Sequence, residues 1–310
     1  MRKKIGVSVV IPNWNGKKLL ERNLPPLITA MDYYGGEYEI IVVDDGSVDG
    51  SPQFLKDSYP SIRVIRLERN RGFPIAANRG VGAAIHDLVL LLNSDIRVER
   101  NFLLPLLSYF DEERTFAVST AIMKDKNTVV TRPYVLEFKY GFLREVLATE
   151  KNGPSLASGA SGGRGLFDRK KFMQLGGFDK IYSPFYYEDM DLSYNAWKKG
   201  FRMYYEPQSI VHHAHQATIG KAFSKRYIRF IFDRNRLIFS WKNLTDSDLL
   251  LQHFLFLPFY LLWNSIRNPL VSLSFLAALR KVPMILRARR REKAFILYGD
   301  KEVLKLIRGA

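Results

Sequence analysis

The chain has 310 residues, of which 47% are hydrophobic and 25% are charged, and its formal net charge is +16. A chain of this length can bury a core without covalent cross-links, and the expected organisation is one large domain with an extension. The sequence contains no cysteine, which excludes disulfides, thiolate nucleophiles and Cys-ligated zinc or iron–sulfur centres.

The positive charge is concentrated near the C-terminus. Residues 221–310 hold 18 Lys/Arg and 6 Asp/Glu, a balance of +12, whereas residues 1–220 hold 29 basic and 25 acidic residues, a balance of +4. We therefore expect a folded domain over residues 1–220 and a basic extension over residues 221–310. Such an extension suits an anionic partner, either membrane lipid or nucleic acid.

The first half of the chain alternates short apolar runs with helical stretches. The first apolar run ends at Pro12 with no small-residue cleavage site after it, so it indicates a strand and not a signal peptide. The alternation predicts an α/β fold with a parallel, doubly wound sheet. The expected strands are residues 7–11, 39–43, 62–67 and 88–92, and the expected helices are residues 17–33, 51–59, 74–86, 169–175 and 188–199.

Polar and acidic residues follow the predicted strands at the point where each ends. Ligands of such sheets bind beyond the carboxyl ends of the strands, so we expect the functional site there. One glycine, Gly16, follows the first strand in place of the three-glycine dinucleotide fingerprint, which argues against a nicotinamide-dependent oxidoreductase. The polar and acidic segments at this edge include Pro12, Asn13, Trp14, Asn15, Asp44, Asp45, Asn70, Gly72, Asn93, Ser94 and Asp95.

The aspartates in these segments also have a structural interpretation. Asp45 precedes Gly46 and Ser47 in a sequence that suits a tight turn, and Asp95 could cap a following helix. A functional interpretation is equally available for Asp95, because Mg²⁺ and Mn²⁺ take oxygen ligands and often bind one protein carboxylate together with substrate phosphates.

Three carboxylates, Glu188, Asp189 and Asp191, fall within four residues at a predicted helix start. The helix dipole favours acids at this position, which explains part of the pattern. The preceding aromatic run at residues 185–187 could form a pocket wall. Crowded carboxylates raise one another's pKa, which suits a base that works near neutral pH, so we favour a functional cluster.

Three of the five histidines, His212, His213 and His215, lie within four residues and favour a metal ligand. On a strand, His213 and His215 would share one side and His212 the other. The chain lacks the i, i+4 histidine spacing of zinc hydrolases, the glycine pattern of a serine nucleophile elbow and a Walker-type phosphate loop.

Taken in this order, these segments resemble the family 2 glycosyltransferases of the GT-A fold. The resemblance covers roughly residues 5–220. The matching segments are residues 8–16 (SVVIPNWNG), 42–47 (VVDDGS), 70–73 (NRGF), 78–80 (NRG), 91–95 (LLNSD), 176–179 (GGFD) and 188–192 (EDMDL), with Pro207 followed by His213.

The resemblance implies an inverting transfer of a sugar from a nucleotide-sugar to a hydroxyl group of a glycan or lipid-linked glycan. It implies that Asp44 holds the nucleotide base and that Asp95 and His213 bind a divalent metal, Mg²⁺ or Mn²⁺, with His215 as the alternative to His213. Asp189 is implied as the catalytic base. The other residues that the resemblance assigns are Glu188 and Asp191 for catalysis and Pro12, Asn13, Trp14, Asn15, Asp45, Asn70, Gly72, Asn78, Asn93 and Ser94 for the donor.

The sequence departs from the family's metal motif at Asn93. That motif often has two acids flanking one residue, whereas asparagine offers a neutral oxygen. Asparagine also occurs at this place in relatives that transfer sugars onto bacterial surface polysaccharides, so the resemblance favours a hexosyl- or rhamnosyltransferase of cell-envelope polysaccharide biosynthesis.

The extension combines apolar runs with arginine clusters. Residues 254–263 form a ten-residue apolar run that contains Pro258, and a second apolar patch spans residues 270–279. A membrane-spanning helix needs about 20 apolar residues, so we expect helices that lie in the membrane interface, placing the protein peripherally at the cytoplasmic face of the membrane.

Other interpretations remain open at this stage. The extension could pack on the catalytic domain or on a second copy in a homo-oligomer, whereas nucleic acid is disfavoured because the basic residues accompany large apolar patches. The chain could also be a catalytically silent nucleotide-sugar or glycan-binding module, although the intact acidic cluster favours an enzyme.

Overall fold

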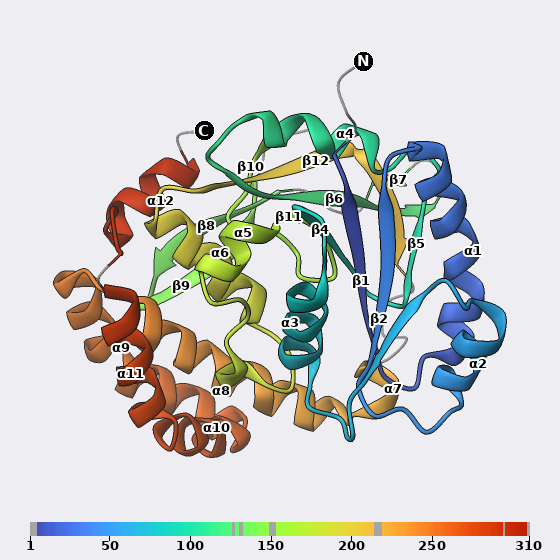
Figure 1. Cartoon of the computed structure of the whole chain (residues 1–310). Coiled ribbons are helices and arrows are strands. Elements are labelled where there is room, and N and C mark those ends of the chain that lie inside the picture. The colour runs from blue at the N-terminus through green and yellow to red at the C-terminus, as the bar shows by residue number, and fades with distance from the viewer. Residues whose placement is uncertain are drawn as a thin grey trace.

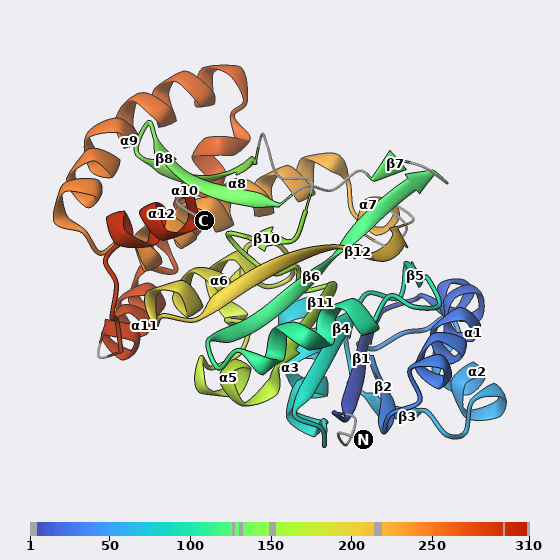
Figure 2. The ribbon, with the colours of Figure 1, turned by 90° about the horizontal axis from the view of Figure 1, so that it is seen from above.

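The computed structural model describes residues 5–125, 128–129, 133–148, 153–213, 219–293 and 295–308. A large twisted sheet crosses the middle of the molecule, with α1 (Lys17–Tyr34) and α2 (Ser51–Ser58) on one side and α3 (Phe73–Ala83) on the other (Figure 1). The last four helices, over residues 247–308, form a layer at the end of the molecule opposite α1 and α2 (Figures 1 and 2).

Four adjacent parallel strands form the N-terminal half of the sheet, in the order β3-β2-β1-β4. These strands are β1 (Val7–Asn13), β2 (Tyr38–Asp44), β3 (Arg63–Arg66) and β4 (Leu88–Leu92). β1 and β4 are almost fully buried because both of their faces are covered, which explains their continuous apolar sequence. The predicted doubly wound α/β arrangement of this half is confirmed, with helix and strand ends shifted by up to three residues.

The sheet becomes mixed beyond β4. The antiparallel strand β11 (Arg164–Asp168) joins β4 to β6 (Thr115–Asp125), and β12 (Arg202–His213) runs parallel to β6. The sheet is completed by β5 (Ile96–Val98), β7 (Thr128–Val129) and β10 (Ser155–Leu156), while β8 (Tyr134–Lys139) and β9 (Phe142–Leu147) form a separate hairpin. The remaining elements before the extension are α4 (Leu104–Leu107), a 3₁₀ turn at Ser108–Asp111, α5 (Arg169–Gln174), a 3₁₀ turn at Lys180–Tyr182 and α6 (Glu188–Lys198).

Side chains that alternate along the strands contribute to two hydrophobic cores, one on each face of the sheet. Val9 and Val42 face α1, whereas Val10 and Val43 face α3. The second of these cores extends without a break into the C-terminal helices. These helices are α7 (Ile219–Ala222), α8 (Lys225–Asn243), α9 (Ser247–Arg267), α10 (Leu270–Leu279), α11 (Val282–Lys293) and α12 (Asp300–Arg308).

The extension therefore packs on the N-terminal part through a shared core. Leu237 and Phe239 of α8, Leu257 of α9 and Ile307 of α12 all belong to the hydrophobic cluster that contains Val10 of β1. The boundary at residue 220 stays a prediction, but the two parts are continuous in packing.

The helix that contains the apolar run is longer than the run itself. The run spans residues 254–263, whereas α9 continues through Pro258 for 21 residues. His253, which precedes the run in sequence, lies on the buried side of the helix. Among the described residues, α9 alone has the length and apolar composition needed to cross a membrane.

Candidate active site

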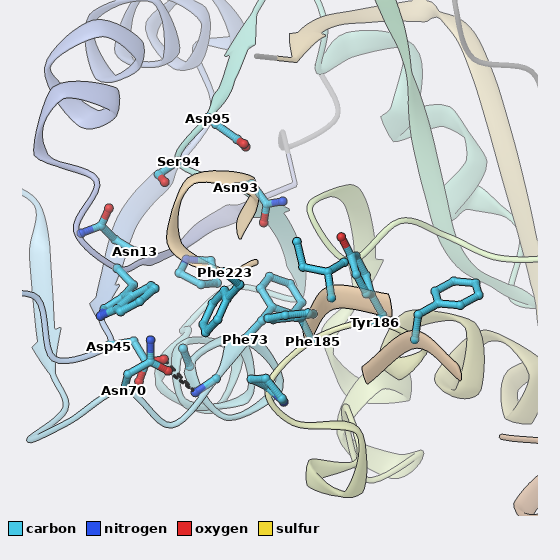
Figure 3. Close-up of a pocket in the computed structure, with 18 of the residues that line it drawn as sticks. Asn13, Asp45, Asn70, Phe73, Asn93, Ser94, Asp95, Phe185, Tyr186 and Phe223 are labelled. Carbon is cyan, nitrogen blue, oxygen red and sulfur yellow. Dashed lines mark hydrogen bonds between the residues drawn. The ribbon is translucent and has the colours of Figure 1, made fainter. Parts of the chain in front are cut away.

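A pocket of about 830 Å³ lies at the carboxyl ends of β1 and β4, where the sequence predicts the site (Figure 3). Residues from the ends of β1 and β12, from the loops after β2, β3 and β4, and from the segment before α6 contribute to its wall. The predicted residues that line this pocket are Pro12, Asn13, Trp14, Asp45, Asn70, Gly72, Asn93, Ser94, Asp95 and His213.

Asp45 ties together two of the loops that form the polar wall. Its carboxylate oxygens accept hydrogen bonds from the backbone N–H groups of Arg71 at 2.7 Å and Gly72 at 2.9 Å. Burial raises the pKa of Asp45, although these two hydrogen bonds act in the opposite direction. Gly72 has φ +91°, and an added Cβ would lie 2.8 Å from the backbone oxygen of Pro184, so glycine is needed at this close approach.

Asp44 and Asn15 do not line the pocket. Their hydrogen bonds stabilise the loops after β1 and β2. Asp44 is fully buried, and its Oδ2 accepts a hydrogen bond from Ser47 N–H at 3.2 Å. Asn15 Oδ1 accepts from Val48 N–H at 2.9 Å, and Asn15 N–H donates to Ser47 Oγ at 2.8 Å. These contacts shape the loop behind the pocket, whereas the roles predicted for both residues toward the nucleotide stay predictions.

Asn78 also holds backbone in place. Its side-chain amide exchanges two hydrogen bonds with the backbone of Phe178, at 2.7 and 2.9 Å. This clamp joins α3 to the Gly-Gly-Phe segment after α5, away from the pocket lining. The donor-binding role predicted for Asn78 stays a prediction.

Asp95 and His213 come together although 118 residues separate them in the sequence. His213 Nε2 lies 3.3 Å from Asp95 Oδ2. Asp95 Oδ1 is buried and has no hydrogen-bond partner within the described part of the chain, and both residues line the pocket. A buried carboxylate oxygen without a donor, beside an imidazole nitrogen, fits a divalent cation.

Within the described residues, Asp95 and His213 are the predicted metal ligands that the structure brings together. No group of three or more His, Cys, Asp or Glu side chains that could hold a metal occurs in the described ranges. His212 points away and pairs with Glu99 at 2.5 Å, as strand alternation predicts, and His215 lies outside the described residues.

The three acids at the start of α6 have different surroundings. Glu188 is 6% exposed, and burial together with the charges of Asp189 and Asp191 raises its pKa well above the usual range. Its Oε2 is buried without a hydrogen-bond partner in the structure as described. Glu188 therefore favours the protonated form, and it does not line the pocket.

Asp189 lies behind the wall of the pocket. Its Oδ2 accepts a hydrogen bond from Gly162 N–H at 3.2 Å, and burial raises its pKa against the opposing effect of that bond. Gly162 separates it from Phe73, a pocket residue, because a Cβ added at Gly162 would lie 3.2 Å from the Phe73 ring and 3.4 Å from Asp189 Cβ. Asp189, like Glu188 and Asp191, is not among the residues that line the pocket.

Asp191 anchors the C-terminal helices. Its carboxylate accepts hydrogen bonds from Tyr182 Oη at 2.7 Å, Lys242 Nζ at 2.6 Å and Asn243 Nδ2 at 2.6 Å. These three donors leave Asp191 engaged with the protein and directed away from the pocket. The catalytic contribution of Asp191 stays a prediction. The observed contacts show that its side chain holds the C-terminal helices in place.

Aromatic side chains form the second half of the pocket, and the sequence predicts this wall only at residues 185–187. Figure 3 shows Phe73, Phe185 and Tyr186 on the side opposite Asn13, Asp45 and Asn70, with Phe223 between them. Six residues of the segment 220–232 contribute to the pocket wall, which are Gly220 of α7, Phe223 of the link between α7 and α8, and Lys225, Ile228, Arg229 and Phe232 of α8. The sequence feature that could have indicated this part of the wall was the i, i+4 spacing of the apolar residues Ile228 and Phe232.

Glu145 of β9 is a further candidate site residue, and the sequence did not reveal it. Its Oε1 accepts a hydrogen bond from Ser158 Oγ at 3.0 Å. Desolvation and the negative charge of Asp189 raise its pKa to about 7. No sequence signal marks this residue, because residues 124–153 show no readable motif.

Comparison with known proteins identifies relatives of this fold. The sequence matches the family model described as Glycosyl transferase family 2 over residues 8–176. The undecaprenyl-phosphate 4-deoxy-4-formamido-L-arabinose transferase of Edwardsiella ictaluri is 40% identical over 95 residues, covering 29% of this chain and 29% of that protein. The chain therefore spans less than a third of that relative's length.

Solved structures support the same fold at low sequence identity. GalNAc-T7, solved with UDP, GalNAc and Mn²⁺, matches with a TM-score of 0.62 and 20% identity over 80% of this chain and 49% of that chain. The mannosyltransferase PcManGT from Pyrobaculum calidifontis, in complex with GDP-Man and Mn²⁺, matches with a TM-score of 0.54 and 16% identity over 98% and 84% of the two chains. The predicted GT-A fold is confirmed.

Proposed function

This chain belongs to glycosyl transferase family 2, and we propose that it transfers a sugar from a nucleotide-sugar donor to a hydroxyl group of a glycan or lipid-linked glycan. One observation carries the proposal. One pocket joins a polar half to an aromatic half built partly by α8, and the polar half contains a buried carboxylate oxygen of Asp95 that has no hydrogen-bond partner among the described residues. The polar half suits a charged donor, and the aromatic half suits an acceptor.

The donor occupies the polar half in this proposal. Asn13, Asp45 and Asn70 surround the space where the loops after β1, β2 and β3 meet (Figure 3). Asn13 Oδ1 is buried without a hydrogen-bond partner among the described residues, so it can accept a hydrogen bond from a ligand. Trp14 offers an aromatic surface, stacked on Phe223 with ring centroids 5.8 Å apart, against which a nucleotide base could pack.

A divalent metal fits beside Asp95 and His213. The two residues would hold Mg²⁺ or Mn²⁺ together with oxygens of the donor diphosphate, and the cation would offset the negative charge that develops on the leaving diphosphate. Asn93 lines the same wall and offers a neutral oxygen. Relatives of this fold solved with Mn²⁺ support a divalent metal.

Asp189 is the proposed catalytic base. Its carboxylate would accept the proton of the acceptor hydroxyl while the hydroxyl oxygen attacks the anomeric carbon and the bond to the diphosphate breaks. One such displacement inverts the anomeric configuration. The raised pKa of Asp189 supports this assignment, because a base is most effective when its pKa approaches the working pH.

The other acids support Asp189 in different ways. Burial and the neighbouring charge of Asp189 raise the pKa of Glu188, and the same two causes raise the pKa of Glu145 to about 7. Asp191 acts as a positioning residue that fixes α6 through Lys242 and Asn243.

The acceptor is proposed to be a glycan of the cell envelope, carried on lipid, and the transferred group a hexosyl or rhamnosyl unit. The aromatic half of the pocket supports an acceptor with an apolar part. A relative named as an undecaprenyl-phosphate transferase supports the same class. In this proposal the enzyme works peripherally at the cytoplasmic face of the membrane.

A donor screen tests the proposal. Purified protein is incubated with a panel of nucleotide-sugars and Mg²⁺ or Mn²⁺, and release of nucleoside diphosphate is measured. We expect release from at least one donor. Release from none, combined with calorimetric donor binding, would instead identify a catalytically silent nucleotide-sugar or glycan-binding module.

The assignment of the base has its own test. Asp189→Asn should remove turnover while donor affinity, measured by calorimetry, stays unchanged. Asp49→Asn is a matched control, because Asp49 is an aspartate outside the pocket that contacts Lys17 N–H and Ser51. Unchanged turnover in Asp189→Asn would reassign the base.

A further inference from the structure

Helix α9 exposes a continuous apolar stripe. Six of its side chains are between 60% and 75% exposed, namely Leu251, Leu255, Phe259, Leu262, Trp263 and Ile266. Spacings of three and four residues place them along one side of the helix. A stripe of this length on one helix is unusual for a surface that faces water alone.

The exposed apolar surface continues onto α10. Leu273, Leu276 and Leu279 are between 42% and 53% exposed, again at three-residue spacing. Both helices lie at the end of the molecule away from the strands β1–β3 (Figures 1 and 2). We call the exposed apolar side chains of α9 and α10 the C-terminal apolar surface.

Cations border this surface, and acids are absent from the sequence around it. Residues 249–291 contain seven Lys/Arg and no Asp/Glu. Arg267 is the last residue of α9, with its guanidinium 4.0 Å from the centroid of the Trp263 ring, and Arg280 directly follows α10. Both arginines are exposed. An anionic surface would be attracted to this border, whereas a second copy of the same surface would bring like charges together.

The inner side of α9 is fixed to the protein. His253 is fully buried, its Nε2 accepts a hydrogen bond from Trp241 Nε1 at 3.0 Å, and its Nδ1 lies 2.6 Å from Gly141 O. The Phe142 ring of the β8–β9 hairpin lies 4.9 Å from the His253 ring, centroid to centroid.

These contacts decide between a spanning helix and one that lies flat. A spanning α9 would have to break its contacts with α8 and the hairpin or carry them into the hydrocarbon layer. Charged Arg144 and Glu137 of that hairpin would then enter lipid. A helix lying in the membrane plane keeps the inner contacts and buries the stripe.

We propose that the C-terminal apolar surface docks on an anionic lipid bilayer, with α9 and α10 lying in the interface and the bordering arginines at the lipid phosphates. This attachment would hold the proposed transferase at a membrane surface of stated lipid chemistry. Its biological use rests on the proposed function. The attachment itself does not require catalysis.

The test compares full-length variants in vesicle flotation. Phe259→Ser, Leu262→Ser and Ile266→Ser are combined in one variant, because all three side chains are exposed and lie outside the hydrophobic core. A matched control combines Ile85→Ser, Leu104→Ser and Met173→Ser, which remove three exposed apolar side chains elsewhere. The vesicles are phosphatidylcholine alone and an equimolar mixture of phosphatidylcholine and phosphatidylglycerol.

We expect the wild-type protein and the control to float with the mixed vesicles, and the α9 variant to bind at least about tenfold more weakly. Binding to phosphatidylcholine alone should be weaker, and added salt should reduce binding to the mixed vesicles. Circular dichroism checks that the α9 variant is folded.

Three results would overturn the proposal. These are equal flotation of the folded α9 variant and the control, wild-type binding that is independent of phosphatidylglycerol, and a wild-type dimer that fails to float and that the α9 variant dissociates. Release of nucleoside diphosphate from a soluble donor is measured in the same samples. A variant that loses flotation but keeps this release separates failure of attachment from failure of the proposed transferase function.

Discussion

Replacing Lys242 with methionine should destabilise the whole chain, because its ammonium group compensates a cluster of buried carboxylates. Lys242 is 1% exposed in its side chain, and its Nζ lies 2.6 Å from Asp191, 3.0 Å from Asp179 and 3.1 Å from Glu292. The three acids raise the pKa of Lys242 against the effect of burial, so the lysine is charged. Methionine has a similar length but leaves the acids without their cation.

The expected loss follows from the burial of Asp191. Removing one partner of a buried ion pair typically costs about 3–5 kcal/mol, because it leaves an uncompensated buried charge. Asp191 is 3% exposed in its side chain, so little solvent reaches it to offset the loss of the ammonium group. Hydrogen bonds from Tyr182 and Asn243 remain, which favours the lower end of this range.

Urea denaturation followed by circular dichroism measures the effect. Lys301→Met is the matched control, because Lys301 Nζ lies 2.6 Å from Asp248, the same separation as between Lys242 and Asp191, but at the surface. The control should unfold at the wild-type urea concentration. Asp191→Asn combined with Lys242→Met should recover part of the loss, because the buried charge is then removed. Unfolding of Lys242→Met at the wild-type urea concentration would refute the reasoning.

The remaining predictions concern the pocket. Asp95→Asn should weaken Mn²⁺ binding measured by calorimetry in the presence of a nucleoside diphosphate, and unchanged Mn²⁺ affinity would place the metal elsewhere. Glu145→Gln removes a negative charge near Asp189 and should lower the pKa of that base, so the acidic limb of the pH profile of kcat/KM should move to lower pH. An unmoved limb would show that the two carboxyl groups are not coupled. Phe223→Ala removes a ring stacked on Trp14 and should raise the donor KM about 2–10-fold, whereas an unchanged KM would separate this ring from donor binding.

The sheet and the polar half of the pocket were predictable from the sequence because both depend on local patterns. Continuous apolar runs identify β1 and β4 as strands covered on both faces, and the rule for ligand sites then places Asn13 and Asp95 at one edge. Strand alternation separated His212 from His213, and the structure confirms that separation.

The contribution of α8 to the pocket was not predictable in the same way. Its residues Ile228 and Phe232 look like any apolar helical pair, and only tertiary packing brings them to the edge of the sheet. The division among the acids of α6 has the same origin. Glu188, Asp189 and Asp191 are neighbours in sequence, but the helical rotation of about 100° per residue sends them toward different surroundings.

Helix α8 links three features that the sequence presents separately. Its first half lines the pocket with Phe232, its backbone at Phe230 accepts a hydrogen bond from Ser274 of α10 at 3.1 Å, and its last turn holds Asp191 through Lys242. Removing residues after 220 would therefore take away part of the pocket wall and leave Asp191 without its cation. The basic extension is thus part of the proposed catalytic unit, and its role in attachment has to be tested by point substitutions on the outer face of α9 and not by truncation.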